Sequence, residues 1–567
     1  MKPIIFIFAL IFSAAITNAQ TTRWALDIGD ASDITESSAI CTDHNHNVYL
    51  AAWYRTDLSM CAATLPHVIP PLYSGANINQ VIAKYDSSGT CRWVVTGIDL
   101  SHYQSNGNAI YAIKYDGDNF TSGDASSIGN IYAAGYATDT LVYGTDTIRN
   151  VACGWECSMG YILKVDTAGH ILWTRTINGT RNSNPTIAGM EVINGCTYVC
   201  GWYQDTVRID TCILPSYNSW TFRGYIAKIN SAGRCLWLKD VSDTGLINSM
   251  DAITTDGKDV YVLGSITGMA VFGSDTLHSS GSYSSFVAKL DTNGNHKWVN
   301  GGAQIGGFLY YDKIEYNHAG HLLISGIYNY KIRFGTDSIS TADTTSVCVA
   351  QLDTAGHFNW LYGTGFKCGY LGSTALSADD SGFYLYTNFR GVAHVGTSTY
   401  TDLGGARGGS FLMARYDTGR NVVWSESYGG PRQSWVSGIA AYPGSVYYTG
   451  VNYNSFTLHG FPIVNHGYAD VLLGRIAIPY NPPPLYTPTH TTTRTTIYPN
   501  PTTGLLNLNS NTPNATDEVY SLTGQLLLSQ QRTGTTISLD LTALAPGVYF
   551  LKDISPLGVV TLKVVKE

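Results

Sequence analysis

The chain has 567 residues, a formal net charge of −8 and only 13% charged residues, whereas glycine (59) and tyrosine (39) are abundant. This composition is typical of a turn-rich all-β protein of more than one domain, and it excludes a helical bundle or a disordered chain. Because phosphate contacts need a basic face, the acidic balance argues against a nucleic-acid partner.

Residues 1–19 are predicted to be a signal peptide. Lys2 precedes an apolar run, and the stretch ends in the small residues Thr17-Asn18-Ala19. The run is shorter than the roughly 20 apolar residues of a membrane span, so cleavage after Ala19 is favoured over a membrane anchor. No transmembrane segment is expected after signal removal, and the mature chain is expected to be secreted.

The eleven cysteines are an odd number. In an oxidising compartment some should form disulfides, and at least one thiol must stay unpaired or bond elsewhere. Cys153 and Cys157 lie in CGWEC, and Cys196 and Cys200 lie in CTYVC, with Cys212 close by. The spacing leaves the pairing open. It lacks the paired C-x2-C array of a zinc site, so no metal site is expected.

A nine-residue stretch, VDTAGHILW (165–173), recurs with small changes along the chain. Each copy has Asp or Asn seven residues before a Trp, and five of six copies have Gly at the fourth turn position. The Asp can accept a backbone N–H bond within the turn and the Gly can adopt positive φ, so each copy is predicted to be a β-hairpin tip. The tryptophans of these copies are Trp93, Trp173, Trp237, Trp298, Trp360 and Trp424.

Three further strand-like segments accompany each turn, so a repeat holds about four short strands. Four-stranded sheets repeated around an axis are a β-propeller. Trp24 near the N-terminus has no hairpin before it, and the last repeat (469–479) has no Trp strand after it. We therefore predict seven blades within residues 20–479, closed by pairing residues 22–28 with the last repeat. An open solenoid is the alternative, but it would need two polar caps.

The D-x-x-G-x-x-x-W turn after a strand such as FVAKL is similar to the repeat of SBBP-type seven-bladed β-propeller proteins. The similarity covers residues 21–479. It implies a fold and hardly any particular activity, because propellers host many unrelated functions.

The composition changes after Ile478. Residues 480–496 are rich in proline and threonine and are expected to be an extended linker. Residues 497–567 alternate short strands and turns, as in a small β-sandwich. Landmarks in order are Tyr498-Pro499-Asn500-Pro501 with Gly504, then SLTGQ (521–525) and LAPGVYF (544–550).

These landmarks resemble a type A C-terminal sorting domain of the type IX secretion system. The resemblance implies a Gram-negative source, the type IX machinery as partner of residues 497–567, and a location outside the cell or on its outer surface. An immunoglobulin-like adhesion module is the alternative.

No catalytic residue is predicted. Metalloprotease, serine-hydrolase and phosphate-loop motifs are missing from the sequence, and the turn lacks the spacing of a sialidase Asp box. The carboxylates of 116–124 lack the distal Glu of a calcium-binding loop, so no metal is expected there. The adjacent Cys-Cys pair of quinoprotein propellers does not occur in the sequence, so no cofactor is expected. Asp33 and Glu36 come nearest to an acid/base pair, and we interpret them as solvated loop residues.

A ligand is expected to meet the loops that enter the innermost strands. Aromatic and amide side chains there suit sugars or peptides, although they could also only fill the channel mouth. The leading hypothesis is a non-catalytic module that binds a glycan or protein; the alternative is an extracellular polysaccharide hydrolase, which would show two converging carboxyls. The candidate residues are Tyr103, Asn182, Asn248, Tyr311, Tyr370 and Trp435.

Overall fold

The computed structural model consists of two compact units, Met1–Pro479 and Tyr480–Glu567. The predicted signal peptide and residues 480–494 of the predicted linker lie outside the residues that the structure describes. The described residues are 21–29, 35–66, 78–100, 109–117, 129–150, 158–180, 185–215, 222–279, 284–301, 303–304, 309–317, 319–341, 345–368, 374–404, 409–432, 434–442, 444–478, 495–510, 513–521, 525–555 and 558–567.

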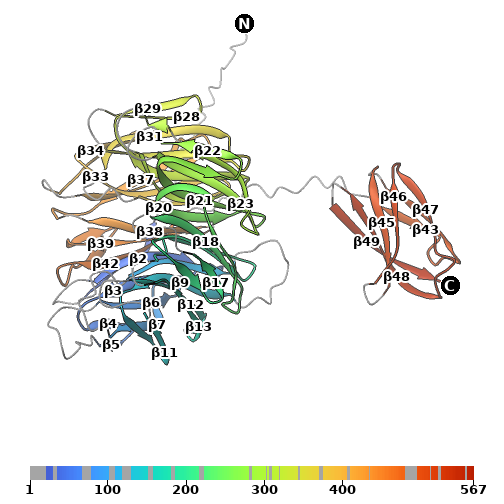
Figure 1. The fold of residues 1–567 in the computed structure, drawn as a ribbon, viewed down its shortest axis with the longest axis horizontal. Helices are drawn as coiled ribbons and strands as arrows, with labels where there is room; N and C mark the ends of the chain where they lie inside the picture. Colours follow the sequence, from blue (N-terminus) through green and yellow to red (C-terminus); the bar gives the residue numbers. More distant parts are fainter. Residues whose placement is uncertain are drawn as a thin grey trace, which may run out of the picture. The chain divides into compact units, whose positions relative to one another are not determined.

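The first unit is an all-β propeller in which groups of four strands pair antiparallel, and we call each group of four a blade (Figure 1). Outer strands or pairing between neighbouring blades extend several of these groups into larger sheets. The first three blades are β2 (Thr35–Thr42), β3 (Val48–Tyr54), β6 (Asn79–Tyr85), β7 (Cys91–Asp99); β8 (Ala109–Asp116), β9 (Asn130–Ala137), β12 (Met159–Asp166), β13 (Ile171–Asn178); and β14 (Gly189–Ile193), β15 (Cys196–Tyr203), β18 (Arg223–Ile229), β19 (Cys235–Asp240). The next three are β20 (Thr244–Thr255), β21 (Asp259–Phe272), β23 (Ser284–Asp291), β24 (His296–Gly301); β26 (Leu309–Tyr316), β27 (His321–Tyr328), β30 (Ser346–Asp353), β31 (Phe358–Cys368); and β32 (Thr374–Asp379), β33 (Gly382–Arg390), β36 (Ser410–Asp417), β37 (Val422–Tyr428).

The closing blade joins the two ends of the propeller sequence. It contains β38 (Trp435–Tyr442), β39 (Ser445–Asn452), β42 (Asp470–Ala477) and β1 (Thr21–Ile28). β1 pairs antiparallel with β42, with Ala25 opposite Gly474 and Ile28 opposite Val471. Figure 1 shows the orange β39 and β42 beside the blue β2 and β3. The predicted pairing of residues 22–28 with the last repeat is thus confirmed, and it covers an edge that would otherwise be exposed.

Short outer strands, which the sequence did not predict, lie between the second and third strands of the blades. Several of them pair with the preceding blade: β10 pairs with β7, and β16 pairs with β13. The outer strands therefore tie neighbouring blades together at their rims. They are β4 (Leu58–Met60), β5 (Ala63–Leu65), β10 (Thr140–Tyr143), β11 (Asp146–Arg149), β16 (Val207–Ile209), β17 (Cys212–Leu214), β22 (Asp275–His278), β28 (Lys331–Phe334), β29 (Asp337–Ser340), β34 (Val392–Val395), β35 (Ser398–Thr401), β40 (Phe456–Leu458) and β41 (Phe461–Ile463), and β28 pairs with β25 (Ala303–Gln304).

The repeated turn has the predicted geometry. Asp166 Oδ1 accepts hydrogen bonds from the backbone N–H groups of Ala168 (2.9 Å) and His170 (2.8 Å). Gly169 has a φ of +94°, as a chain reversal of this kind requires. In the sixth copy, Arg420 takes the positive-φ position (+67°), and its guanidinium lies 5.5 Å from the centre of the Trp360 ring. At this turn the Arg420 guanidinium contacts the Trp360 ring, whereas in the other turns the glycine lies against the Trp of the preceding blade.

The turns also hold neighbouring blades together. The Trp93 indole N–H donates a 3.0 Å hydrogen bond to the carbonyl oxygen of Thr167 in the next blade, and Lys84 Nζ donates to the same oxygen at 3.1 Å. The same indole bond runs from Trp24 to Ser87, Trp173 to Ser231, Trp237 to Thr292 and Trp298 to Thr354. Across the closure, Arg475 of β42 supplies the second donor to Ser87.

The tryptophans of the repeated strand are not uniformly buried. Trp24 (6% exposed) and Trp424 (7%) are buried, whereas Trp93, Trp173, Trp237, Trp298 and Trp360 are partly buried. One ring edge must remain at the surface, because the indole reaches across the blade boundary to a surface turn.

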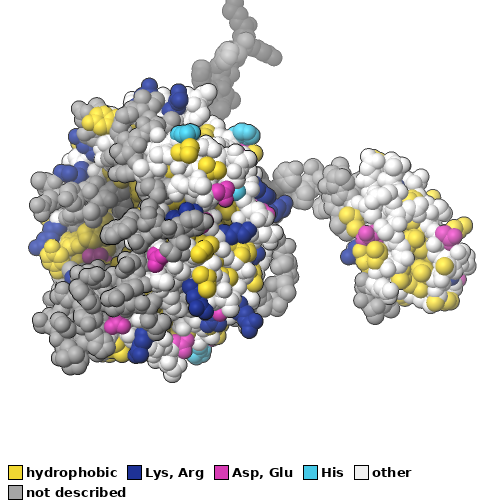
Figure 2. All heavy atoms as spheres, in the orientation of Figure 1, with side chains coloured by type: hydrophobic (Ala, Val, Ile, Leu, Met, Phe, Trp, Pro, Cys, Tyr) yellow, Lys and Arg dark blue, Asp and Glu magenta, His cyan; other side chains and the backbone are white. Residues whose placement is uncertain are grey.

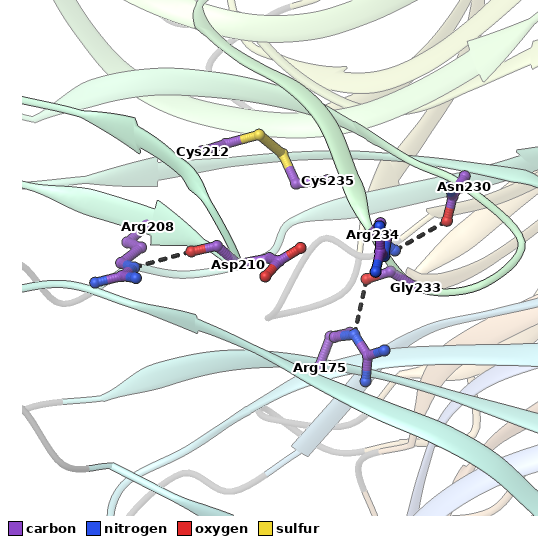
Figure 3. The surroundings of a disulfide bond; sticks show 8 residues. All are labelled: Arg175, Arg208, Asp210, Cys212, Asn230, Gly233, Arg234 and Cys235. Atoms are coloured by element: carbon purple, nitrogen blue, oxygen red, sulfur yellow. Dashed lines mark hydrogen bonds between the residues drawn. A yellow bond between two sulfur atoms is a disulfide. The ribbon is translucent and has the colours of Figure 1, made fainter.

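Two disulfides occupy equivalent places in the first and third blades. Cys61 bonds to Cys91, and Cys212 bonds to Cys235 (Figure 3). Each joins an outer hairpin to the start of the Trp strand of its own blade. Around the second, Arg175 Nε donates to the carbonyl of Gly233 at 2.8 Å from the neighbouring blade. Cys153 and Cys157 lie outside the described residues.

The second unit is a β-sandwich. Its core contains Leu506, Val519 and Leu551, all fully buried. Arg532, also buried, forms ion pairs with Asp517 (2.9 Å) and Asp553 (2.7 Å), and these pairs link three strands of one sheet. Its two sheets are β43 (Thr496–Tyr498), β44 (Leu505–Asn509), β47 (Thr536–Asp540), and β46 (Leu526–Arg532), β45 (Ala515–Tyr520), β48 (Gly547–Ser555), β49 (Gly558–Lys566).

Within the described ranges, no helix has the length and apolar character that a membrane span requires.

Candidate functional site

A cavity of about 120 Å3 lies on the propeller axis, lined by the first strands of the blades. Lys114 Nζ in the cavity lies 2.9 Å from Glu191 Oε2, and Glu315 faces the same ammonium group. Burial raises the pKa of Glu315, and the positive charge of Lys114 opposes that rise. Lys114 thus forms an ion pair with Glu191 and lies near a second carboxyl, that of Glu315, and each of these comes from another blade.

Asp251 is a further acidic group of this cavity. It accepts hydrogen bonds from the hydroxyls of Tyr310 (2.9 Å) and Ser249 (3.1 Å), and burial raises its pKa to about 7. Pockets for small ligands usually measure roughly 300–1,000 Å3. The axial cavity is smaller than that, and Lys114 and Asp251 already have partners within the propeller, so it is better explained as a structural plug than as a substrate site.

A cluster of aromatic rings lies where the strands of the closing blade begin and end, and we call it the aromatic cluster. The ring centres of Trp435 and Tyr453 are 5.2 Å apart, and those of Tyr453 and Tyr468 are 5.4 Å apart and nearly perpendicular. Tyr468 is 61% exposed. Edge-to-face and tilted pairs of this kind hold one another in place.

Charged groups flank the aromatic cluster. Glu36 of β2 is hydrogen-bonded with Tyr453; burial raises its pKa to about 7, while the positive charge of Arg55 partly opposes the rise. The Arg55 guanidinium lies 5.3 Å from the centre of the Trp53 ring. Glu36 is thus a half-buried strand residue, and its interpretation as a solvated loop residue was wrong, because β2 begins one residue earlier. Asp33 lies outside the described residues.

The predicted ligand-binding residues lie in different environments in the structure. Trp435 lies in the aromatic cluster. Tyr311 is 1% exposed and packs its ring 5.8 Å from that of Phe334, so it is a core residue, whereas neighbouring Tyr310 is 43% exposed. Asn248 lies in β20, but its side chain is outside the described part. The remaining three, Tyr103, Asn182 and Tyr370, are outside the described residues.

Sequence reasoning missed Tyr453 and Tyr468. Both lie close to the outer strands β40 and β41, in the loops that join these strands to β39 and β42. The signal that could have found them is the local density of aromatic residues between Trp435 and Asp470.

The face in Figure 2 shows basic and acidic side chains interspersed, without a large patch of one charge.

The landmark residues of the C-terminal unit pack on its last strand. Asn500 Nδ2 donates to the carbonyl of Lys563 (2.8 Å), and Asn500 Oδ1 accepts from the N–H of Val565 (2.8 Å). Thr502 N–H donates to the carbonyl of Val565 at 2.8 Å. Tyr498 is 54% exposed and remains available at the surface.

Residues 496–567 match the family described as the secretion system C-terminal sorting domain. The C-terminal unit is therefore a sorting domain of the type IX secretion system, and it directs the chain to the cell surface or the extracellular space. Its partner is the type IX machinery.

Solved structures with similarity to this chain include three proteins that share 8–9% identity with it. The phage phi92 endosialidase has 9% identity and a TM-score of 0.37, covering 95% of this chain and 87% of that chain. A variant of the Synechocystis apocarotenoid oxygenase has 9% identity and a TM-score of 0.34, covering 76% and 88%. PorZ, a surface component of the type-IX secretion system of Porphyromonas gingivalis, has 8% identity and a TM-score of 0.14, covering 95% and 100%. A search of curated proteins found no match.

Proposed function

We propose that residues 20–479 are a seven-bladed propeller of the SBBP type that binds a glycan without catalysis after export by the sorting domain. The observation that carries this proposal is the aromatic cluster of Trp435, Tyr453 and Tyr468. Stacking on aromatic rings together with hydrogen bonds from neighbouring polar groups is the usual chemistry of ligand sites of this kind.

The surroundings of the cluster support a built surface. Asn454 accepts a hydrogen bond from the backbone N–H of Arg432 (2.8 Å) and donates one to its carbonyl (2.9 Å), which fixes the loop before β38. Because the loop is fixed, Trp435 is held in place before a ligand arrives, and little conformational entropy is lost on binding.

The test is a glycan array with the chain from residue 20 onward. Trp435→Ala and Tyr468→Ala should each weaken binding of any glycan found by at least tenfold. Tyr330→Ala is the matched control, because Tyr330 is 48% exposed in a turn between β27 and β28, away from the cluster. If all variants bind the glycan equally, the aromatic cluster is not the binding site. If the chain binds only proteins, its ligand is a protein and not a glycan.

A polysaccharide hydrolase is the second candidate, favoured by Glu36. A carboxyl with a pKa near 7 beside a binding surface is suited to act as a general acid. Release of reducing sugar by the wild type, lost in Glu36→Gln while binding persists, would support the hydrolase and contradict non-catalytic binding.

A further inference from the structure

A pair of buried carboxylates lies at the seam where β1 closes the propeller. Asp27 is in the closing strand and Asp470 begins β42. The Asp27 side chain is 3% exposed and that of Asp470 is fully buried. In the described part of the chain, their ion-pair partner is His466, which is 48% exposed.

The three side chains converge. His466 Nδ1 lies 3.7 Å from Asp27 Oδ2 and 3.5 Å from Asp470 Oδ2. One potential ligand atom from each residue lies within 4.8 Å of the others. Nitrogen and oxygen ligands bind Zn²⁺ at roughly 2.0–2.2 Å, so neighbouring ligands of a tetrahedral site lie roughly 3.3–3.6 Å apart. The observed separations are close to that spacing.

Two carboxylate oxygens at this seam lack a hydrogen-bond donor among the described residues. They are Asp27 Oδ2, which faces His466, and Asp470 Oδ1. The other oxygens are satisfied, since Asn452 donates to Asp27 Oδ1 at 3.2 Å and the His466 backbone N–H donates to Asp470 Oδ2. Buried carboxylates without donors are costly unless a proton or a cation neutralises them.

The backbone is shaped around these groups. At Gly29 a Cβ atom would lie 1.9 Å from Asp470 Oδ1, so only glycine leaves room for this carboxylate. The loop that carries His466 is held by Asn465, whose side-chain amide donates to the carbonyl of Asn452 at 3.0 Å. The three side chains are thus positioned by their surroundings and not only by each other.

We propose that Asp27, His466 and Asp470 bind one divalent transition-metal cation of the Zn²⁺ type, which fastens the closing strand β1 to the last repeat. Two carboxylates balance the charge of the cation, and the imidazole favours Zn²⁺ over Ca²⁺ or Mg²⁺. The exposed side of His466 gives the ion access and leaves a coordination position for water. The sequence predicts no metal site, because the two aspartates lie at opposite ends of the propeller sequence and only the closure brings them together.

The test uses the chain from residue 20 onward, freed of metal by a chelator and then titrated calorimetrically with Zn²⁺, Mn²⁺, Ca²⁺ and Mg²⁺. We expect one Zn²⁺ per chain, with Ca²⁺ and Mg²⁺ at least tenfold weaker. Zn²⁺ should also raise the melting temperature and slow amide hydrogen exchange in residues 23–28, which a surface-bound ion would not do.

His466→Gln should weaken Zn²⁺ binding at least tenfold and abolish the slowing of amide exchange. Because the His466 side chain is partly exposed, we expect the variant to fold, and circular dichroism checks this. His170→Gln is the matched control, because His170 contacts a single carboxylate, that of Asp166, at 2.9 Å and is 77% exposed. Absence of Zn²⁺ binding by the wild type, equal binding by His466→Gln, or unchanged exchange in β1 would overturn the proposal; the first result would assign a shared proton to the carboxylates instead. None of these results depends on glycan binding.

Discussion

The Trp93 indole N–H donates a 3.0 Å hydrogen bond to the carbonyl oxygen of Thr167, a turn residue of the following blade. The same relationship recurs around the propeller and, through Trp24 and Ser87, crosses the closure. The repeated nine residues therefore serve as a connector: in five copies the turn accepts a hydrogen bond from the Trp of the blade before it.

Replacing Trp93 tests this connection. Trp93→Phe keeps most of the ring packing but removes the hydrogen bond, so we expect a loss of about 1 kcal/mol in the free energy of unfolding. Trp93→Ala should cost about 2–4 kcal/mol, since the ring is only partly buried. Urea unfolding measures both.

Trp424→Phe is the matched control for this substitution. In the described residues the Trp424 N–H has no hydrogen-bond partner, because β42 of the closing blade is not followed by a turn of the repeated kind. A Trp93→Phe loss no larger than that of Trp424→Phe would contradict a stabilising role for the bond.

Gly169→Ala should destabilise the propeller for two reasons. The φ of +94° is strained for alanine, and its Cβ would lie 3.0 Å from the Trp93 ring. Gly320→Ala carries a similar φ of +88° with nothing within 4 Å, so it isolates the strain. We expect about 1 kcal/mol for Gly320→Ala and about 2 kcal/mol for Gly169→Ala by urea unfolding. Equal losses would show that the contact with Trp93 is unimportant.

The lowered pKa values of the turn aspartates predict that the folded chain loses stability in acid. Burial raises the pKa of Asp86, but the hydrogen bonds that Ser88, Thr90 and Arg92 donate to its carboxylate outweigh burial and lower this pKa to about 2. Because this pKa is lower in the folded chain than the usual value of about 3.9, the carboxylate contributes stability above about pH 4, and the contribution is lost as the pH falls toward about 2.

Asp86→Asn should flatten this part of the pH dependence, since an amide oxygen can accept the same turn bonds, as Asn230 does naturally at 2.9 Å from the Arg234 N–H. Urea midpoints measured from pH 5 to pH 2 provide the check. An unchanged slope in the variant would show that Asp86 does not titrate in this range.

Removing the disulfide between Cys212 and Cys235 should destabilise the third blade. The bond closes a loop with a sequence separation of 23, for which the loss of chain entropy in the unfolded state predicts about 3 kcal/mol. The double variant Cys212→Ser with Cys235→Ser, compared by thermal unfolding with the wild type, measures it. No change in melting temperature would show that the outer hairpin is held by β13 alone.

The repeated features were predictable because they depend on local chemistry. The Asp and Gly of each turn mark the blades. The Trp24 strand, which has no hairpin before it, marks the closure. Each of these signals can be read from a stretch of sequence no longer than one repeat. The axial group of Lys114, Glu191 and Glu315 was not predictable, since each residue comes from a different blade and only the ring brings them together.

Residue-level errors came from the two-residue period of strands. Tyr310 and Tyr311 are neighbours, but only one can face outward, and a shift of one residue exchanges the exposed and buried faces. Glu36 was misassigned for a related reason: β2 begins at Thr35, earlier than the hydroxyl-rich letters around it suggested.

The most direct test of the proposed function is a calorimetric titration of the best array glycan into the chain from residue 20 onward, with the glycan recovered afterwards. The proposal predicts saturable binding to the wild type, binding at least tenfold weaker with Trp435→Ala, and an intact glycan. Unchanged binding by the variant, or a cleaved glycan, would contradict it.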